Sequence, residues 1–236
     1  MFRSQSFLDR VRKTTTLYLI ILNIGFYFLQ NITQFLYSTD ILLVYGAKIN
    51  AFILSGQLWR LITPIFLHGS LVHIGFNMYA LYSIGPSLER RYGKQPFLLL
   101  YFFGGLFGNI FSFIFSANIS LGSSTAIFGL IAAQAVYIYK NRLLLGSAAN
   151  GLLRNVLVMI AINLMLGLSP GIDNWGHMGG LVGGFLFAWF AGPSYGISEN
   201  VFGENIIVRE NKRETLVIGG LLILAAALTF LGFLVR

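Results

Sequence analysis

Seven long apolar segments constrain this chain more than any other feature of its sequence. They occupy residues 16–37, 71–88, 96–116, 124–139, 155–168, 176–192 and 215–235. A helix needs about 20 apolar residues to cross a hydrocarbon core about 30 Å thick, and most of these segments approach that length. Only 10% of the residues are charged, whereas a soluble domain carries about 25%. The sequence therefore predicts an all-α polytopic membrane protein.

The distribution of Lys and Arg predicts how these segments are oriented. Basic residues cluster before the first segment and in the connections after the second, fourth and sixth segments, whereas the other side holds only Lys48, Arg60 and Arg236. Because basic connections stay on the cytoplasmic side, we expect a cytoplasmic N-terminus and a C-terminus outside. The net charge is +8, but short basic clusters between apolar segments indicate topology signals rather than a nucleic-acid surface.

The expected organisation has four parts. They are a cytoplasmic N-terminal segment at 1–15, a membrane domain of six helices at 16–192, a cytoplasmic connection at 193–214 and a seventh transmembrane helix at 215–236. The outer connection 38–70 is unusually apolar for a loop, and we expect it to lie in the outer leaflet. Within it, Trp59 beside Arg60 is typical of an interfacial aromatic anchor next to a cation that extends towards the headgroups.

Several classes of membrane protein are disfavoured by residues that the chain lacks. There is no cysteine, which excludes thiol catalysis and thiolate metal sites. The aspartates Asp9, Asp40 and Asp173 all lie outside the apolar segments, which excludes an intramembrane aspartyl protease and argues against a proton-coupled transporter. The three histidines form no His-Glu-x-x-His motif, so we expect no metal.

A serine and two histidines lie at one depth in three different segments. Ser124, His73 and His177 each stand 16 residues before the residue that closes their segment, which is roughly 24 Å along a helix. The second, fourth and sixth segments run in the same direction, so all three residues are expected near the outer ends. This coincidence suggests a reaction centre inside the bilayer.

Ser124 begins the fourth segment, where a loop becomes a helix. A serine at a helix start is most often an N-cap, but Ser123 is equally available for that role. A helix start also supplies unpaired N–H groups and the positive end of a dipole, which suit an oxyanion.

His177 is an ionisable residue inside an apolar segment, which is usually functional, although a histidine bonded to a neighbouring helix is the alternative. Two small-xxx-small pairs follow it, Gly179 with Gly183 and Gly180 with Gly184. Such pairs let a partner helix approach closely. If that partner is the fourth segment, Ser124 and His177 meet.

His73 and Asn77 are four residues apart and share one face of the second segment. Both can donate hydrogen bonds, which suits an anionic tetrahedral intermediate. A pair of interhelical polar contacts is the alternative interpretation. His68, at the outer mouth of the same segment, is expected to contact the loop or the interface.

With these residues in place, the chain resembles the rhomboid family of intramembrane serine proteases over roughly residues 58–192. The resemblance rests on Trp59-Arg60, the pattern His68–His73–Asn77, Glu89-Arg90-Arg91-Tyr92-Gly93, Gly122-x-Ser124, and His177-x-x-Gly180-x-x-x-Gly184. It implies a six-helix core without cofactor, with the seventh helix as an addition found in some members. The resemblance also implies that the partners of the protein are membrane lipid and single-span or polytopic membrane-protein substrates. The expected location of the protein is a bacterial plasma membrane.

The resemblance also assigns roles to residues. It implies Ser124 as nucleophile, His177 as general base, and His73 and Asn77 as oxyanion donors together with the Ser124 N–H. Phe128, one turn after Ser124, is expected to pack on the His177 ring.

One residue departs from the family pattern. Thr125 stands where the family usually has glycine, and a β-branched residue takes a positive φ poorly. We therefore expect Thr125 to crowd the oxyanion site. It is the one feature that favours the alternative function, a non-proteolytic rhomboid-like protein that escorts client helices. A small-solute channel or transporter is a third class, for which the sequence offers no intramembrane charge.

Overall fold

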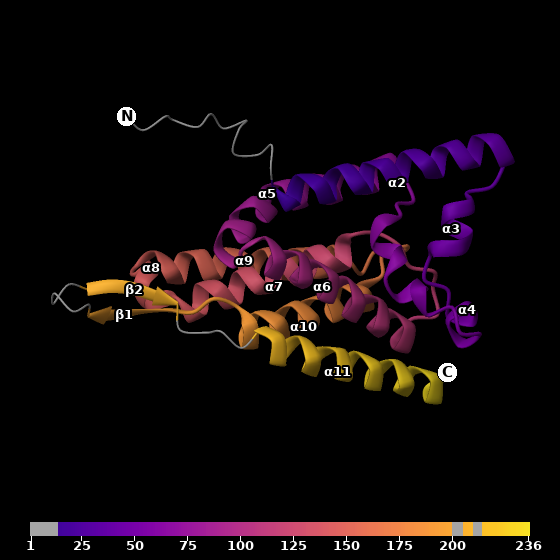
Figure 1. Ribbon diagram of the computed structural model, residues 1–236. Helices are drawn as coiled ribbons and strands as arrows, with labels where there is room; N and C mark the ends of the chain where they lie inside the picture. Colours follow the sequence, from indigo (N-terminus) through magenta and orange to yellow (C-terminus); the bar gives the residue numbers. More distant parts are fainter. Residues whose placement is uncertain (1–13, 200–204, 210–213) are drawn as a thin grey trace.

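The computed structural model is an elongated bundle of helices, and it describes residues 14–199, 205–209 and 214–236. Seven long helices occupy the seven apolar segments (Figure 1). They are α2 (Thr15–Tyr37), α5 (Leu71–Tyr92), α6 (Lys94–Phe115), α7 (Ser124–Lys140), α9 (Ala148–Leu166), α10 (Asn174–Ala191) and α11 (Glu214–Val235). The shorter elements are α3 (Ile41–Gly46), α4 (Asn50–Leu54), η1 (Leu58–Leu61), η2 (Thr63–Phe66) and α8 (Arg142–Leu145).

Helix α9 and the connection 193–214 differ most from the prediction. Helix α9 begins at Ala148 rather than at 155, because Gly146 with its φ of 55° ends α8 just before it. The expected connection 193–214 contains an antiparallel hairpin of β1 (Tyr195–Glu199) and β2 (Asn205–Arg209), which the sequence did not predict. The expected segment 1–15 lies almost wholly outside the described residues.

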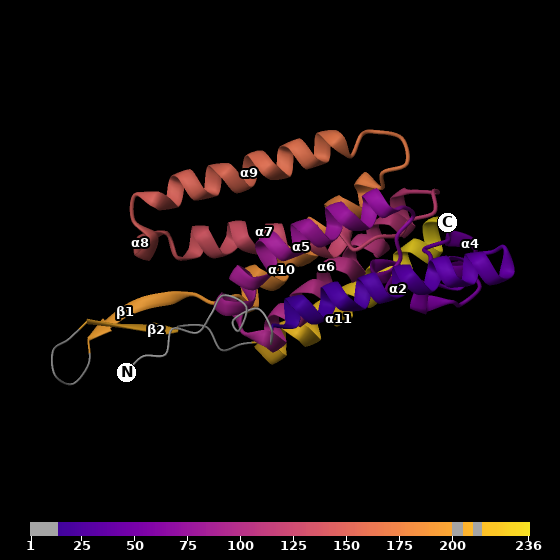
Figure 2. The ribbon, with the colours of Figure 1, turned by 90° about the horizontal axis from the view of Figure 1, so that it is seen from above.

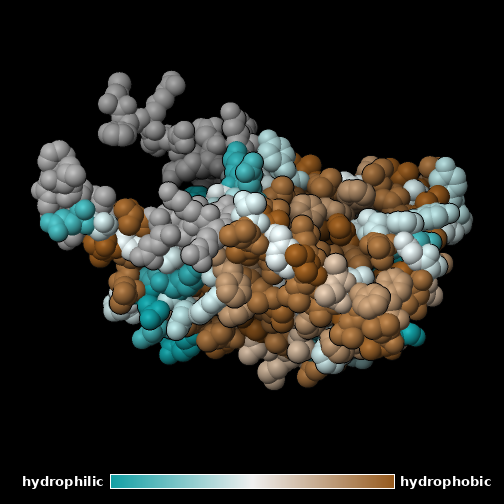
Figure 3. Space-filling view, turned by 60° about the horizontal axis from the view of Figure 1, so that its bottom comes forward, coloured by the Kyte–Doolittle hydropathy of each residue, from teal (hydrophilic) through white to brown (hydrophobic). Residues whose placement is uncertain are grey.

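Four of the described helices are long and apolar enough to cross a membrane: α2, α6, α9 and residues Thr215–Val235 of α11. On the face in Figure 3, hydrophobic side chains cover the length of the helices, and hydrophilic ones gather at the end that carries the hairpin. The other three long helices, α5, α7 and α10, carry the polar candidates His73, Asn77, Ser124 and His177. Helix α7 has only 17 residues.

Helices α6, α7 and α10 form the centre of the bundle, and each packs against the other two. Helix α6 is the most enclosed of the four apolar helices, with 67% of its apolar stretch buried. Helix α2 packs on α5, and α11 packs on α6 and α10. Helix α9 lies along one side, against α7 (Figure 2). This arrangement leaves space between α9 and α5 beside the start of α7.

The candidate residues all lie in the first two turns of their helices. Ser124 is the first residue of α7, His73 the third of α5 and His177 the fourth of α10. These three helix starts lie at the same end of the bundle as the C-terminus (Figure 1). Because α5, α7 and α10 begin at the same end of the bundle, His73, Asn77, Ser124 and His177 lie at that end.

Candidate active site

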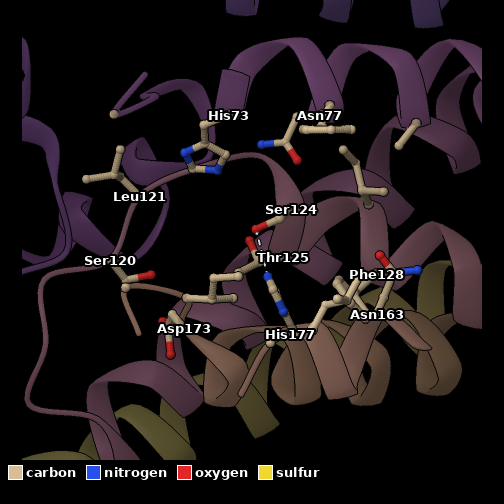
Figure 4. A pocket seen from close by; sticks show the side chains of 18 of the residues that line it. His73, Asn77, Ser120, Leu121, Ser124, Thr125, Phe128, Asn163, Asp173 and His177 are labelled. Carbon is tan, nitrogen blue, oxygen red and sulfur yellow. Dashed lines mark hydrogen bonds between the residues drawn. The ribbon is translucent and has the colours of Figure 1, made fainter. Parts of the chain in front are cut away.

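Ser124 and His177 are in contact. Ser124 Oγ lies 3.0 Å from His177 Nε2, within hydrogen-bond distance. Figure 4 shows the two side chains meeting between α7 and α10 at the floor of a cavity. His177 is 8% exposed. The geometry is that of a nucleophile next to a base.

The imidazole is oriented by an aromatic ring rather than by a carboxylate. Phe128 stacks on His177 with ring centroids 4.2 Å apart and an interplanar angle of 16°, the contact that its position one turn after Ser124 predicts. Among the described residues, His177 Nδ1 is buried and has no hydrogen-bond partner. The pair is therefore a dyad, and packing holds the ring.

Glycines on α10 allow the close approach that brings the two residues together. A Cβ on Gly180 would collide with the Thr125 carbonyl, and one on Gly184 with the Gly129 carbonyl. The other pair, Gly179 and Gly183, faces α6 instead of α7, because a Cβ on either would strike the α6 backbone or its phenylalanines. The two glycine pairs thus serve two different helix contacts, whereas the sequence suggested one.

His73 and Asn77 point from α5 towards Ser124 (Figure 4). The Nδ2 of Asn77 is buried and, within the described part of the chain, has no partner. Gly122 brings the loop before Ser124 against both side chains: its φ is 121°, and a Cβ there would lie 2.7 Å from His73 Nε2 and 3.6 Å from Asn77 Nδ2. A side chain at 122 is excluded by both the backbone angle and the His73 ring.

Ser123 is the N-cap residue of α7, but its hydroxyl makes no capping bond. Instead, Ser123 Oγ lies 3.3 Å from His68 Nε2. His68 is held through its backbone by Gln30 of α2, whose Oε1 accepts from the His68 N–H at 3.0 Å. Burial lowers the pKa of His68 to about 3. His68 is therefore a neutral support for the serine loop.

Arg60 differs from its prediction. Rather than extending to headgroups, it is 1% exposed, and its guanidinium donates to the carbonyls of Ala47 and Val44 at 2.7 Å and to Gln57 Oε1 at 2.8 Å. The loop carbonyls around it replace the solvation that a lone arginine would need. Its neighbour Trp59 is half exposed and donates from Nε1 to the Tyr45 carbonyl at 3.0 Å.

The connection 38–70 also holds the loop that precedes the serine. The Nζ of Lys48 donates to the carbonyls of Ser116 and Asn118 at 2.9 and 3.0 Å. The backbones of Lys48 and Ser120 form an antiparallel bridge, and Gly122 N–H donates to the Pro64 carbonyl at 2.9 Å. These bonds hold the loop that leads to Ser124.

Thr125 lines the cavity beside Ser124, but the expectation that it needs a positive φ is wrong. It lies inside α7, and Ser38 is the one described non-glycine residue with a positive φ, so Thr125 does not need that conformation. Its side chain packs against Gly108 of α6 and Gly176 of α10. Thr125 is 3% exposed. A matching pair of glycines accommodates the extra side chain.

The dyad opens into a cavity of about 840 Å³ between α5, α7 and α9. Its walls are mainly apolar, with Phe76 from α5, Ile131 from α7 and Met159 from α9. This volume lies in the range of sites that enclose a ligand. The cavity suits an apolar segment that reaches Ser124 between α5 and α9.

Sequence reasoning missed Asn163, whose amide lies on the α9 wall of this cavity. Its Nδ2 donates to the Met159 carbonyl one turn back. Asn163 is the single polar residue of 156–166, and that isolation is the signal that marks it. Asp173, at the outer rim, caps α10 by accepting from the Gly176 N–H at 3.0 Å. Within the described residues, no three His, Asp or Glu side chains gather as a metal site would require.

Comparison with known proteins assigns this arrangement to a family. The family model described as the rhomboid domain matches residues 55–194. The chain is 40% identical over 198 residues to the rhomboid protease GluP of Bacillus subtilis, covering 83% of this chain and 38% of that protein. It is 37% identical over 152 residues to the chloroplastic RHOMBOID-like protein 9 of Arabidopsis thaliana, covering 64% and 35%.

A third relative is the Rhomboid-like protease 1 of Toxoplasma gondii, which is 35% identical over 159 residues, or 63% of this chain and 52% of that protein. The matches thus span between about a third and a half of the length of these relatives.

Proposed function

Because this chain belongs to the rhomboid family, we propose that it is an intramembrane serine endopeptidase that cleaves transmembrane segments of other membrane proteins. The rhomboid domain and four apolar helices make it a multi-pass integral membrane protein. The observation that carries the proposal is the 3.0 Å contact between Ser124 Oγ and His177 Nε2 at the floor of a cavity.

In the first step, Ser124 Oγ attacks the carbonyl carbon of the scissile peptide bond while His177 Nε2 accepts the hydroxyl proton. The C–N bond then breaks, and His177 returns the proton to the leaving nitrogen. The product is an ester between the substrate carbonyl and Ser124. Stacking on Phe128 holds the imidazole for both transfers.

In the second step, water attacks the ester and His177 accepts its proton, which then passes to Ser124 Oγ as the C–O bond breaks. The free carboxylic acid leaves, and the dyad is restored. Both steps use His177 Nε2 as the base. The other ring nitrogen, Nδ1, is buried and has no hydrogen-bond partner among the described residues, so it takes no part in the proton transfers.

Negative charge develops on the carbonyl oxygen in both steps. We assign its stabilisation to Asn77 Nδ2, the His73 ring and the Ser124 N–H. Asn77 Nδ2 has no partner among the described residues, and the first N–H groups of a helix have none within the helix. Donors that are already in place stabilise the transition state without reorganisation.

The substrate is proposed to enter between α5 and α9 and to unwind near Ser124. A peptide carbonyl in a helix is hydrogen-bonded and shielded, so it is not attacked while the helix is intact. The cavity beside Ser124 is lined in part by residues of α5 and α9, among them Phe76 and Met159. Helix-breaking or small residues near the scissile bond are therefore expected to favour cleavage.

The topology proposed from the basic residues places the dyad near the outer membrane face, with the N-terminus cytoplasmic and the C-terminus outside. Lys48 and Arg236 support one shared side, because both donate to carbonyls at the end of α6: Lys48 to Ser116, and Arg236 to Phe113 at 3.0 Å. The cytoplasmic clusters at 1–13 and 210–213 lie outside the described residues.

Cleavage of a membrane substrate by the purified protein in liposomes tests the proposal. Ser124→Ala and His177→Ala should each lower the cleavage rate at least about 10³-fold, as loss of a nucleophile or base does. Ser147→Ala, a change at an exposed serine outside the cavity, should cleave like the parent. Labelling by a fluorophosphonate should require both Ser124 and His177. Parental rates in Ser124→Ala would contradict the proposal.

The escort function has no observation in its favour. Thr125 was its one supporting feature, and the side chain is accommodated by Gly108 and Gly176. A protein that only escorted clients should show no His177-dependent labelling, so the same experiment separates the two functions.

A further inference from the structure

We propose that Thr125 is a positioning residue: its side chain is a wedge between α6, α7 and α10 that keeps Ser124 within reach of His177. The claim about catalysis rests on the proposed function, whereas the wedge itself is a claim about packing. Thr125 follows Ser124 directly, and Gly176, which it contacts, directly precedes His177. The wedge is thus one residue away from each member of the dyad.

Two glycines form the socket for this side chain, and a third lies against the Thr125 backbone. A Cβ on Gly108 of α6 would lie 2.5 Å from Thr125 Cβ and 2.8 Å from its Cγ2. A Cβ on Gly176 of α10 would lie 3.1 Å from the same Cγ2, and one on Gly180 would overlap the Thr125 carbonyl. Thr125 therefore fills the place where the three central helices meet.

Shape rather than polarity explains the residue. Thr125 Oγ1 is buried and has no hydrogen-bond partner among the described residues, so the hydroxyl brings no bond that valine would lose. The two groups on Cβ are what fill the socket, and a β-branched side chain has few rotamers in a helix. A residue without the second branch would leave a gap that the helices close only partly.

Loss of the Thr125 side chain is expected to affect the dyad through a movement of α7 relative to α10. Thr125 touches α10 on the turn that carries His177 and is itself part of the first turn of α7. Loss of the wedge lets these two turns shift relative to each other. A displacement of about 1 Å at reacting groups costs up to about 10²-fold in rate. Thr125 also lines the cavity, but the walls on α5 and α9 are untouched, so substrate binding should change little.

Conservative substitutions separate the wedge from the hydroxyl. Thr125→Val keeps the shape and should retain kcat within about twofold. Thr125→Ser keeps the hydroxyl but loses the branch, and it should lower kcat about tenfold with an unchanged KM. Thr229→Ser on α11, whose hydroxyl donates to the Ala225 carbonyl far from the dyad, is the matched control. The proposal is overturned if Thr125→Ser has the parental kcat. It is also overturned if Thr125→Val lowers kcat about tenfold, the loss expected for Thr125→Ser.

The socket offers a second, reciprocal measurement. Gly108→Ala places a methyl group on Thr125 and should slow cleavage by displacing the dyad. Thr125→Gly should cost less in the Gly108→Ala background than in the parent, because it removes one of the two close contacts of the new methyl, the other being the Gly176 carbonyl at 2.7 Å. If Thr125→Gly is equally harmful in both backgrounds, no wedge exists.

Two readouts keep the proposals distinct. The same variants are compared by thermal midpoint in detergent and by the rate of fluorophosphonate labelling at Ser124. A parent that neither cleaves nor labels would reject the proposed function, while a smaller loss of thermal midpoint from Thr125→Gly in the Gly108→Ala background than in the parent would still establish the wedge. That difference in thermal midpoints alone, with labelling and kcat unaffected, would show packing without positioning and overturn the inference.

Discussion

At the scale of single residues, the site consists of polar groups that the membrane domain leaves partly unsatisfied. Asn77 Nδ2 and His177 Nδ1 are both buried without partners among the described residues. Such groups lower the stability of a fold unless they are paired. For Asn77, retention beside Ser124 follows from the proposed reaction, in which the oxyanion of the substrate carbonyl completes the bonding of Nδ2.

Asn77→Ala should therefore separate activity from stability. We expect kcat to fall about 10²- to 10³-fold with little change in KM, because an oxyanion donor acts in the transition state. The thermal midpoint should stay the same or rise, since the variant removes an unpaired buried donor. Asn31→Ala, at an exposed asparagine of α2, should alter neither. A simultaneous fall in stability and activity would instead indicate a structural Asn77.

Sequence reasoning reached the residues whose signals are local. Equal depth in parallel helices, together with the glycine pairs after His177, suggested that Ser124 meets His177, and the resemblance to the rhomboid family placed Phe128 on the ring. Arg60 and Thr125 were misjudged because their surroundings come from distant parts of the chain. The carbonyls of Val44 and Ala47 enclose Arg60 only once the loop folds back. Nothing near Thr125 in sequence reveals that Gly108 lies beside it.

At the scale of elements, the ends of helices carry the contacts that fix their positions. The Glu89 carboxylate, near the end of α5, accepts from the N–H groups of Thr15 and Thr16 at 2.7 and 2.9 Å and from the Thr16 hydroxyl at 2.9 Å. Gly85 lets Thr16 approach α5, because a Cβ there would lie 2.5 Å from Thr16 Cγ2. One acidic residue thus ties the start of α2 to α5.

Glu89→Gln should loosen this junction. A glutamine brings an NH₂ group against donors and removes the charge that favours a helix N-terminus. We expect a loss of about 1–3 kcal/mol in stability, measured as a lower thermal midpoint in detergent. Cleavage well below that midpoint should remain near parental because Glu89 lies far from Ser124 along α5. Glu199→Gln, at an exposed position of β1, is the control, and equal midpoints for both variants would refute the role.

The sequence predicted every long helix but not the hairpin β1–β2. Long apolar helices can be predicted from a continuous run of hydrophobic residues, whereas the hairpin strands are short and partly polar. The local sequence pattern likewise did not predict which neighbouring helix each glycine of α10 contacts. Gly179 and Gly180 are adjacent in sequence, yet one packs on α6 and the other on α7.

At the scale of the whole molecule, the proposed topology makes the two ends of the bundle face different compartments. The absence of cysteine from the sequence allows a clean measurement with single-cysteine variants. Ser55 lies in the connection 38–70, and Ser147 lies between α8 and α9. Both are exposed.

Ser55→Cys should react with a membrane-impermeant maleimide in intact cells, whereas Ser147→Cys should react only after the membrane is permeabilised. This difference follows from the placement of basic connections on the cytoplasmic side. Labelling is measured by mass shift, and denatured samples give the maximum for each variant. The reverse pattern would invert the proposed orientation and move the dyad to the cytoplasmic face.

The glycines of α10 limit where new selectivity can arise. On the sides facing α6 and α7 this helix presents bare backbone, and adding even a methyl group at Gly184 would drive it into Gly129. Random mutagenesis aimed at altered substrate choice should therefore yield few active variants on α10. The freedom to vary lies across the cavity, at positions such as Val72 and Phe76 on α5 and Met159 and Asn163 on α9. Backbone contacts set the packing of α10, whereas the cavity walls on α5 and α9 are open to adaptation.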